Sequence, residues 1–313
     1  MNTPSVLALT AALACISSNG STQDLPSSRR SVSYHTIELD GLNVFYREAG
    51  AADAPTVFLL HGFPSSSRMW EPLLPLLAGK YHLIAPDYPG FGNSSAPPPS
   101  SFEYTFDNLA RVMGQLGTRL GITSYVLFMQ DYGGPVGFRM ALANPERVRG
   151  IIIQNAVAHE QGLSRLWEAR RKYWADPVHE LENLKANFTS FEATRQRHVG
   201  SSPHPDRYDP DTWTDEYAFL TRPGQADIQT TLFLDYRTNV AAYPQWQKWL
   251  REAQPPTLVV WGKYDPSFTV AGATAYADDV PKAEIHFLEA GHFALDEATD
   301  EIACLVRNFL ERL

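Results

Sequence analysis

The sequence contains few cysteines, no run of basic residues and no long hydrophobic stretch. Its 313 residues include only two cysteines, Cys15 and Cys304, which are too few for a disulfide framework. No stretch is long enough to span a bilayer. The formal net charge of −9 disfavours nucleic acid and anionic membrane surfaces as partners. No cluster of metal ligands and no phosphate-binding loop occurs, so we expect neither a metal ion nor an organic cofactor.

The composition is that of a globular protein, with 44% hydrophobic and 19% charged residues. A chain of this length can bury a full core, either as one α/β domain with an insertion or as two domains.

Residues 1–24 differ from the rest and are predicted to be a signal-like or disordered leader. An apolar run at 6–16 precedes small polar residues, as in a secretory signal peptide, but residues 1–5 contain no lysine or arginine. The protein is expected to be secreted if this leader is a signal peptide, and cytoplasmic otherwise. Triplets beginning at Asn19, Asn93 and Asn187 match the glycosylation pattern, which also arises often by chance.

Strand and helix patterns alternate along residues 25–157 and again along 245–313. Strands are expected at 34–39, 42–46, 56–60, 81–85, 125–130, 148–154, 257–261 and 284–288. Asp40-Gly41 between the first two predicts a β-hairpin. Helices are expected at about 67–77, 105–120, 133–144, 246–251 and 296–310. This alternation predicts a mostly parallel sheet with helices on both faces.

Residues 158–244 contain no strand pattern and are rich in aromatic residues, arginine and helix formers. We interpret them as an inserted helical lid over the edge of the sheet where the strand-to-helix loops lie. The alternative is an ordinary helical subdomain with no role at a site.

Asp131 stands where the predicted strand at 125–130 turns into a helix. Gly133 and Gly134 follow closely, and Pro135 suits the first helical turn. Such a sharp turn holds the side chain at its apex above the sheet, with backbone N–H groups pointing toward it. The pattern predicts a nucleophile elbow with aspartate in place of serine. The alternative is an aspartate that caps an ordinary helix.

Two further polar residues, Asp265 and His292, also follow predicted parallel strands. The carboxyl ends of parallel strands lie on one edge of a sheet, so we expect Asp131, Asp265 and His292 to face the same edge. Their order along the chain is nucleophile, acid and histidine.

With these motifs the chain after residue 34 resembles the α/β-hydrolase superfamily, and in particular its Asp-nucleophile branch of epoxide hydrolases and haloalkane dehalogenases. The resemblance implies that Asp131 attacks an sp³ carbon to form an ester, which water activated by His292 then hydrolyses. It implies that Asp265 orients the imidazole and that the backbone N–H groups of Phe63 and Tyr132 stabilise the oxyanion. The motifs that carry it are His61-Gly62-Phe63-Pro64, Asp87-Tyr88-Pro89-Gly90-Phe91-Gly92, Gln130-Asp131-Tyr132-Gly133-Gly134, Trp261-Gly262-Lys263-Tyr264-Asp265-Pro266 and Gly291-His292-Phe293.

Epoxide hydrolases of this branch use lid tyrosines to protonate the opening oxygen, and Tyr236 resembles one of them. For a second tyrosine, Tyr173 is our prediction, and Tyr208 and Tyr217 are alternatives. Dehalogenases usually bind halide with a tryptophan directly after the nucleophile, where this chain has Tyr132.

The substrate is predicted to contact His61, Trp70, Tyr173 and Trp174, and Trp174 could supply an N–H to a halide. Ser94 lies in a segment that mimics a serine elbow, but the three prolines at 97–99 exclude a helix behind it.

The resemblance therefore implies an α/β-hydrolase fold and, most directly, hydrolysis of an epoxide to a diol. Haloalkane dehalogenation is the first alternative, and a non-hydrolytic protein that binds or cyclises a small apolar molecule is the second. The aromatic lid predicts a small apolar substrate. The sequence does not predict the oligomeric state.

Overall fold

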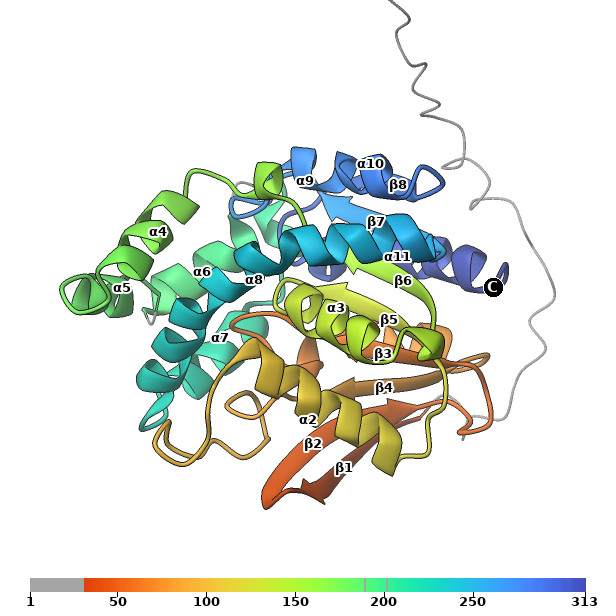
Figure 1. The fold of residues 1–313 in the computed structure, drawn as a ribbon, viewed down its shortest axis with the longest axis horizontal. Coiled ribbons are helices and arrows are strands. Elements are labelled where there is room, and N and C mark those ends of the chain that lie inside the picture. Colours follow the sequence, from red (N-terminus) through yellow and green to blue (C-terminus); the bar gives the residue numbers. More distant parts are fainter. Residues whose placement is uncertain (1–30, 189, 201) are drawn as a thin grey trace, which may run out of the picture.

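The computed structural model describes residues 31–188, 190–200 and 202–313. The leader at 1–24 and the triplet at Asn19 lie outside this part of the chain. Eight strands form one sheet in the order β1-β2-β4-β3-β5-β6-β7-β8 (Figure 1). Strands β1 and β2 are antiparallel to their neighbours, and all pairs from β4 to β8 are parallel. The strands are β1 Val32–Leu39, β2 Leu42–Ala49, β3 Thr56–Leu60, β4 His82–Pro86, β5 Tyr125–Gln130, β6 Val148–Gln154, β7 Thr257–Gly262 and β8 Glu284–Leu288.

The predicted hairpin joins β1 to β2, with Leu39 paired to Leu42 across the turn. Asp40 and Gly41 have φ angles of 50° and 78°. A two-residue turn with positive φ at both positions matches the twist of the strands that it connects.

The strands alternate between two buried faces, as sheets covered on both sides require. In β3, Phe58 and Leu60 belong to one core cluster, and Val57 and Leu59 to the other. The first face packs against α2 Phe106–Arg119, α3 Gly133–Ala143 and α8 Gln225–Ala253. The second face packs against α1 Leu74–Leu77 and α11 Ala294–Leu310. This arrangement confirms the predicted fold class.

Helices inserted between β6 and β7 extend beyond one end of the sheet (Figure 1). We call them the inserted helices. They are α4 Trp167–Ala175, α5 Leu181–Phe188, α6 Phe191–Val199, α7 Pro210–Leu220 and α8. No strand occurs in the described part of 158–244, where one isolated bridge joins Leu163 to Phe268.

Helix α8 continues through residue 244, where the sequence predicts the inserted segment to end. Pro244 lies inside the helix and removes one backbone donor. The helix continues because buried aromatic residues on both sides of Pro244 hold it on the core. Trp246 stacks on Phe138 of α3 with ring centroids 5.0 Å apart, and Tyr243 packs beside Trp246 at 5.3 Å.

The helix predicted at 67–77 is instead a 3₁₀ turn, Ser67–Trp70, followed by the short α1. Pro72 lies between the two, and proline cannot donate to a continuous helical ladder. The remaining elements are α9 Val270–Thr274, α10 Tyr276–Asp279 and the 3₁₀ turns Pro145–Arg147, Glu160–Gly162 and Pro205–Arg207.

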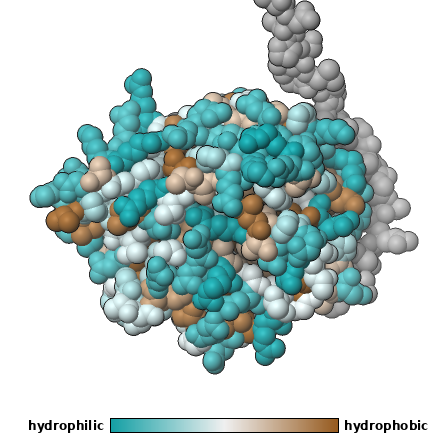
Figure 2. Space-filling view, in the orientation of Figure 1, coloured by the Kyte–Doolittle hydropathy of each residue, from teal (hydrophilic) through white to brown (hydrophobic). Residues whose placement is uncertain are grey.

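The face of the molecule seen in Figure 2 is mainly hydrophilic, with hydrophobic residues scattered over it. None of the helices in the described residues combines the length and apolarity that crossing a membrane requires. Cys304 on α11 is half-buried and disulfide-bonded.

Candidate active site

Asp131 occupies the turn between β5 and α3 with a φ angle of 47°. Aspartate is one of the few residues other than glycine that adopt this left-handed conformation. The turn brings α3 against β3 so closely that a Cβ on Gly133 would lie 2.1 Å from the Leu60 carbonyl oxygen. The N-cap of α3 is Tyr132 rather than Asp131. The aspartate is therefore presented at the apex of a sharp elbow and does not cap the helix.

The two carboxylate oxygens of Asp131 have different surroundings. The backbone N–H of Phe63 donates to Oδ1 at 2.8 Å, and Oδ2 lies 3.8 Å from Nε2 of His292. Burial raises the pKa of Asp131, and His292 together with the backbone N–H groups of Phe63 and Tyr132 partly offsets that rise. One oxygen thus accepts a backbone N–H while the other faces the imidazole.

His292 lies between the two carboxylates. Its Nδ1 is 2.7 Å from Oδ2 of Asp265. Burial lowers the pKa of His292, but the charges of Asp265 and Asp131 reverse the effect and leave it above its usual value. Asp265 is fixed in turn, since its Oδ1 accepts the backbone N–H groups of Ser267 and Phe268 at 2.7 and 3.0 Å.

Asn155, directly after β6, supports this acid and was not singled out from the sequence. Its Nδ2 donates to Oδ2 of Asp265 at 2.8 Å and to the Gly262 carbonyl at 3.0 Å. Its Oδ1 accepts the N–H of Gly262 at 2.8 Å. The available signal was an asparagine at the end of a predicted central strand, on the same edge as the other polar groups.

Gln130, the last residue of β5, also reaches the imidazole. Its Nε2 lies 3.1 Å from Nε2 of His292. An amide donor at this position pairs with an unprotonated Nε2, which leaves the proton on Nδ1, where it can be donated to Asp265. Gln130 and Asp265 together favour the tautomer of His292 that a general base requires.

A cavity of about 20 Å³ lies above Asp131. It is lined by Phe63, Asp131, Tyr132, Trp167, Arg170, Arg197, Phe233, Pro266, Ser267 and His292. Five of these residues also line a cavity of about 780 Å³. The shared residues are Arg170, Arg197, Phe233, Pro266 and Ser267. The larger cavity therefore adjoins the smaller one at the two arginines, neither of which the sequence analysis identified.

Two of the aromatic residues predicted to contact substrate do not line the cavity above Asp131. Tyr173 lines the larger cavity, and its hydroxyl donates to the Thr230 carbonyl at 3.2 Å. Trp174 lines neither cavity, and its indole N–H donates to the Phe233 carbonyl at 2.7 Å.

Tyr236 is buried against Trp167, with ring centroids 4.5 Å apart, and against Tyr132 at 5.8 Å. It lines neither of the two cavities. Burial, then Tyr243 and Asp131, raise the pKa of Tyr236 well above its ordinary value.

His61 and Trp70 line neither cavity. His61 stacks on Tyr88 at 4.1 Å, and burial lowers its pKa to about 4. Trp70 packs on Phe128 at 4.7 Å in the core cluster of the opposite sheet face.

No helix follows Ser94 before Phe106, as the three prolines at 97–99 predict. The Ser94 hydroxyl donates to the Asp87 carbonyl at 2.7 Å and accepts the Phe45 N–H at 2.9 Å.

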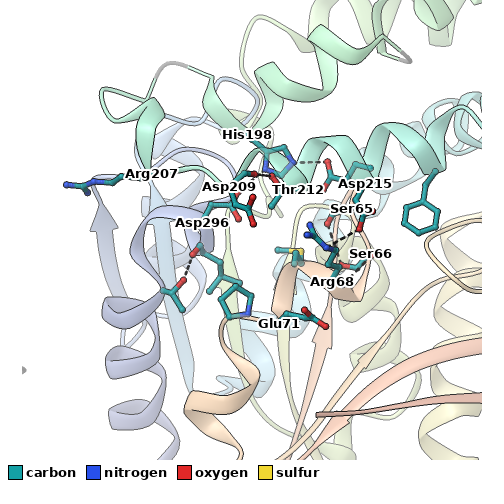
Figure 3. Close-up of a pocket in the computed structure, with 16 residues that line it drawn as sticks. Ser65, Ser66, Arg68, Glu71, His198, Arg207, Asp209, Thr212, Asp215 and Asp296 are labelled. Atoms are coloured by element: carbon teal, nitrogen blue, oxygen red, sulfur yellow. Dashed lines mark hydrogen bonds and ion pairs between the residues drawn. The ribbon is translucent and has the colours of Figure 1, made fainter. Parts of the chain in front are cut away.

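A separate cavity of about 260 Å³ lies between the inserted helices and the core (Figure 3). On its wall His198 of α6 makes two 2.8 Å contacts, one with Glu216 of α7 and one with Asp296 of α11. Burial alone would lower the pKa of His198, but these carboxylates raise it to about 10. Arg68 and Asp215 form a further ion pair between the core and α7 at 3.0 Å. Within the residues that the structure describes, no group of three or more histidine, cysteine or acidic side chains is arranged to hold a metal ion.

The mostly parallel sheet and its strand order are those of the α/β-hydrolase fold. Residues 55–299 match the family model described as the alpha/beta hydrolase fold, and the chain belongs to this family.

Among its relatives is an uncharacterized hydrolase of Saccharomyces cerevisiae, 44% identical over 276 residues, which cover 86% of this chain and 94% of the relative. A haloalkane dehalogenase of Bradyrhizobium diazoefficiens is 41% identical over 111 residues, or 36% of this chain and 35% of the relative. A solved structure of the epoxide hydrolase CorEH without ligand superimposes with a TM-score of 0.74 and 18% identity, covering 90% of this chain and 99% of the other. The protein is thus a hydrolase of the α/β-hydrolase family that has haloalkane dehalogenases among its relatives and shares its fold with a solved epoxide hydrolase.

Proposed function

We propose that the protein hydrolyses an electrophilic sp³ carbon through an ester on Asp131, and that its substrate is an epoxide, which it converts to a diol. The observation that carries this proposal is the unequal environment of the Asp131 carboxylate. Oδ1 accepts the Phe63 N–H, and Oδ2 faces His292 across 3.8 Å at the base of the cavity. A nucleophilic carboxylate needs one oxygen directed at the substrate and donors at the other.

In the first step Oδ2 of Asp131 attacks a ring carbon. The bond from Oδ2 to carbon forms as the ring carbon–oxygen bond breaks, and the electron pair of that bond remains on the departing oxygen. That oxygen needs a proton. The Tyr132 hydroxyl belongs to a residue that lines the cavity, and it has no hydrogen-bond partner in the described chain.

Burial, followed by the charge of Asp131, raises the pKa of Tyr132 well above its ordinary value, so the hydroxyl stays protonated until the ring opens. Tyr132 is therefore our first proton donor. Tyr236, the donor expected from the sequence, is buried behind the cavity wall and is our second.

In the second step His292 removes a proton from water, and the hydroxide attacks the ester carbonyl of Asp131. Asp265 offsets the charge of the imidazolium, and the N–H groups of Phe63 and Tyr132 stabilise the oxyanion. Collapse releases the diol, whose new hydroxyl takes one proton of the water. The other proton restores the Tyr132 hydroxyl, so that atoms and charge balance.

Haloalkane dehalogenation is the second candidate, because the same ester chemistry serves a halide and a relative carries that name. Dehalogenation is disfavoured because the indole N–H groups nearest the site already donate to backbone carbonyls. Those of Trp167 and Trp174 donate to the carbonyls of Ser267 and Phe233 at 3.1 and 2.7 Å. The Tyr132 hydroxyl and the arginine side chains remain as halide donors.

The proposal is tested by trapping the ester. In His292→Gln, attack by Asp131 should proceed and hydrolysis should stall, so intact-mass measurement after incubation with an aryl epoxide should show one substrate added per chain. Asp131→Asn should show none.

Diol formation from the epoxide, halide release from a bromoalkane and binding without turnover then separate the three candidate functions. If the wild-type enzyme turns over the substrate and the His292→Gln variant never carries an adduct, covalent catalysis by Asp131 is excluded.

A further inference from the structure

We propose that the substrate carries a carboxylate, and that Arg170 and Arg197 bind it beside the reacting carbon. This inference rests on the proposed function and names the class of substrate more closely: a short epoxide with a carboxylate on or next to the ring. It revises the sequence-based expectation of a purely apolar substrate.

The two arginines come from different inserted helices and meet at one place. Arg170 lies on α4 and Arg197 on α6, and both line the cavity above Asp131 as well as the larger adjoining cavity. A molecule that passes from the larger cavity to the nucleophile therefore passes both guanidinium groups.

Aromatic rings support the guanidinium groups from their faces. The Arg170 Cζ lies 4.2 Å from the ring centroid of Trp167 and 5.5 Å from that of Phe233. The Arg197 Cζ lies 4.8 Å from the ring centroid of Phe63. Stacking holds a guanidinium in place, and in Arg170 it leaves the in-plane N–H donors for a planar anion such as a carboxylate.

Within the described residues, Arg170 makes no hydrogen bond and no ion pair. A partly buried guanidinium that lines a cavity is expensive to leave unsatisfied, and a bound anion satisfies it.

The charges point the same way. Burial and the proximity of Arg170 lower the pKa of Arg197 to about 10, so both groups are cationic at neutral pH and repel each other. A carboxylate between them relieves that repulsion. It also places an anion near the anionic Asp131 without a net repulsive cost, because two positive charges accompany it.

The two arginines lie close to the nucleophile. The arginines and the nucleophile line the same cavity of about 20 Å³. The reacting carbon and the carboxylate must therefore be close together in the substrate, as in 2,3-epoxypropanoate.

The first test uses a matched pair of substrates, 2,3-epoxypropanoate and its amide, which share size and shape but differ in charge. Wild-type kcat/KM should favour the acid. Arg170→Met should lower kcat/KM for the acid by roughly 10- to 100-fold, the effect of losing a charge-assisted hydrogen bond, and change that for the amide by less than about threefold. Arg170→Lys keeps the charge but loses the planar fork, so it should fall between wild type and Arg170→Met.

Arg171→Met is the control on the same helix, because Arg171 is exposed and pairs with Glu160 at 2.9 Å. It should leave both substrates unaffected. Equal loss for acid and amide in folded Arg170→Met, checked by thermal melting, would overturn the inference.

The second test does not depend on turnover. Calorimetry with Asp131→Asn should show propanoate binding at least roughly tenfold more tightly than propanamide, and the preference should disappear when Arg170→Met is added. No preference would overturn the carboxylate inference even if His292→Gln forms its adduct with a neutral epoxide. A clear preference without any adduct would leave this inference standing and overturn the covalent mechanism alone.

Discussion

Asp131 adopts a left-handed backbone conformation, and its neighbours explain why it can. Conformations of this kind persist in residues other than glycine when the surrounding structure determines them. Here a Cβ on Gly62 would lie 2.3 Å from Cβ of Asp131, so the segment that supplies the Phe63 N–H passes directly against the elbow. The close packing of two glycine-containing segments fixes both the nucleophile and its backbone donor.

The position of Tyr132 predicts that its hydroxyl contributes more to ring opening than that of Tyr236. Tyr132→Phe should slow adduct formation from an epoxide in the His292→Gln background by about 100-fold or more, the usual range for general acid catalysis. Adduct formation from a bromoalkane should change much less, because a halide leaves without a proton. Rapid-quench mass measurements give both rates.

Tyr236→Phe is the matched comparison, since it removes one hydroxyl from a buried tyrosine that does not line the cavity. A larger loss of epoxide opening in Tyr236→Phe than in Tyr132→Phe would reassign the proton donor to Tyr236.

At the level of single residues, the sequence identified three polar side chains that follow strands, but it missed Asn155 after β6 and the two arginines on helices. Asp131, Asp265 and His292 could be placed together because parallel strands end at one edge of the sheet. In the structure Nε2 of His292 lies 3.8 Å from Oδ2 of Asp131, and Nδ1 lies 2.7 Å from Oδ2 of Asp265. Arg170 and Arg197 could not be placed, because an arginine on a helix is usually solvent-exposed. Only the arrangement of the inserted helices over the core brings these two to the cavity above Asp131.

At the level of elements, the contact between His198, Glu216 and Asp296 joins α6 and α7 to α11. His198 also stacks on Phe293 at 4.0 Å, next to His292 in the chain. The inserted helices are thereby fastened to the segment that carries the imidazole of the site. Arg197, adjacent to His198, adds a cation near Glu216.

This contact predicts a pH-dependent contribution to stability. The pKa of His198 is about 10 in the folded protein, against about 6.5 in an unfolded chain. Between these values the folded state retains a proton that the unfolded state has lost, so the contribution is complete below about pH 6.5 and is lost as the pH rises to about 10. His198→Gln should lower the free energy of unfolding by about 3 kcal/mol at pH 6.5, and by progressively less toward pH 10.

Urea titrations at several pH values measure this difference. His179→Gln is the control, since the His179 side chain is 81% exposed. A difference between wild type and His198→Gln that stays constant from pH 6.5 to 10 would contradict the ion-pair interpretation.

Strands were predicted better than helices that contain a proline. All eight strands lie within two or three residues of their predicted positions, because each is a short apolar run between turn residues. Helix predictions failed at prolines for opposite reasons. Pro72 interrupts its segment, whereas Pro244 is accommodated because Trp246 and Tyr243 are anchored to the core.

At the level of the whole molecule, stability depends on a sheet buried on both faces. Phe128 of β5 is fully buried and packs on Trp70, on the face opposite to α3. Phe128→Ala should lower the free energy of unfolding by about 3–5 kcal/mol, because it removes a large side chain from a close-packed site. Val178→Ala, at a side chain that is 79% exposed, should change it by less than about 0.5 kcal/mol. Equal effects of the two substitutions would show that the second face contributes little.

Helix α8 belongs to both the insertion and the core, and this has a consequence for building chimeras. A recombination junction at residue 244 would cut a continuous helix whose buried side chains contact both parts. Segment exchange between this protein and a relative should instead join the chains in the loop after Ala253 and before Thr257, where no helical turn is severed. The transplanted unit then brings its own long helix, and the recipient must supply a complementary surface on α3.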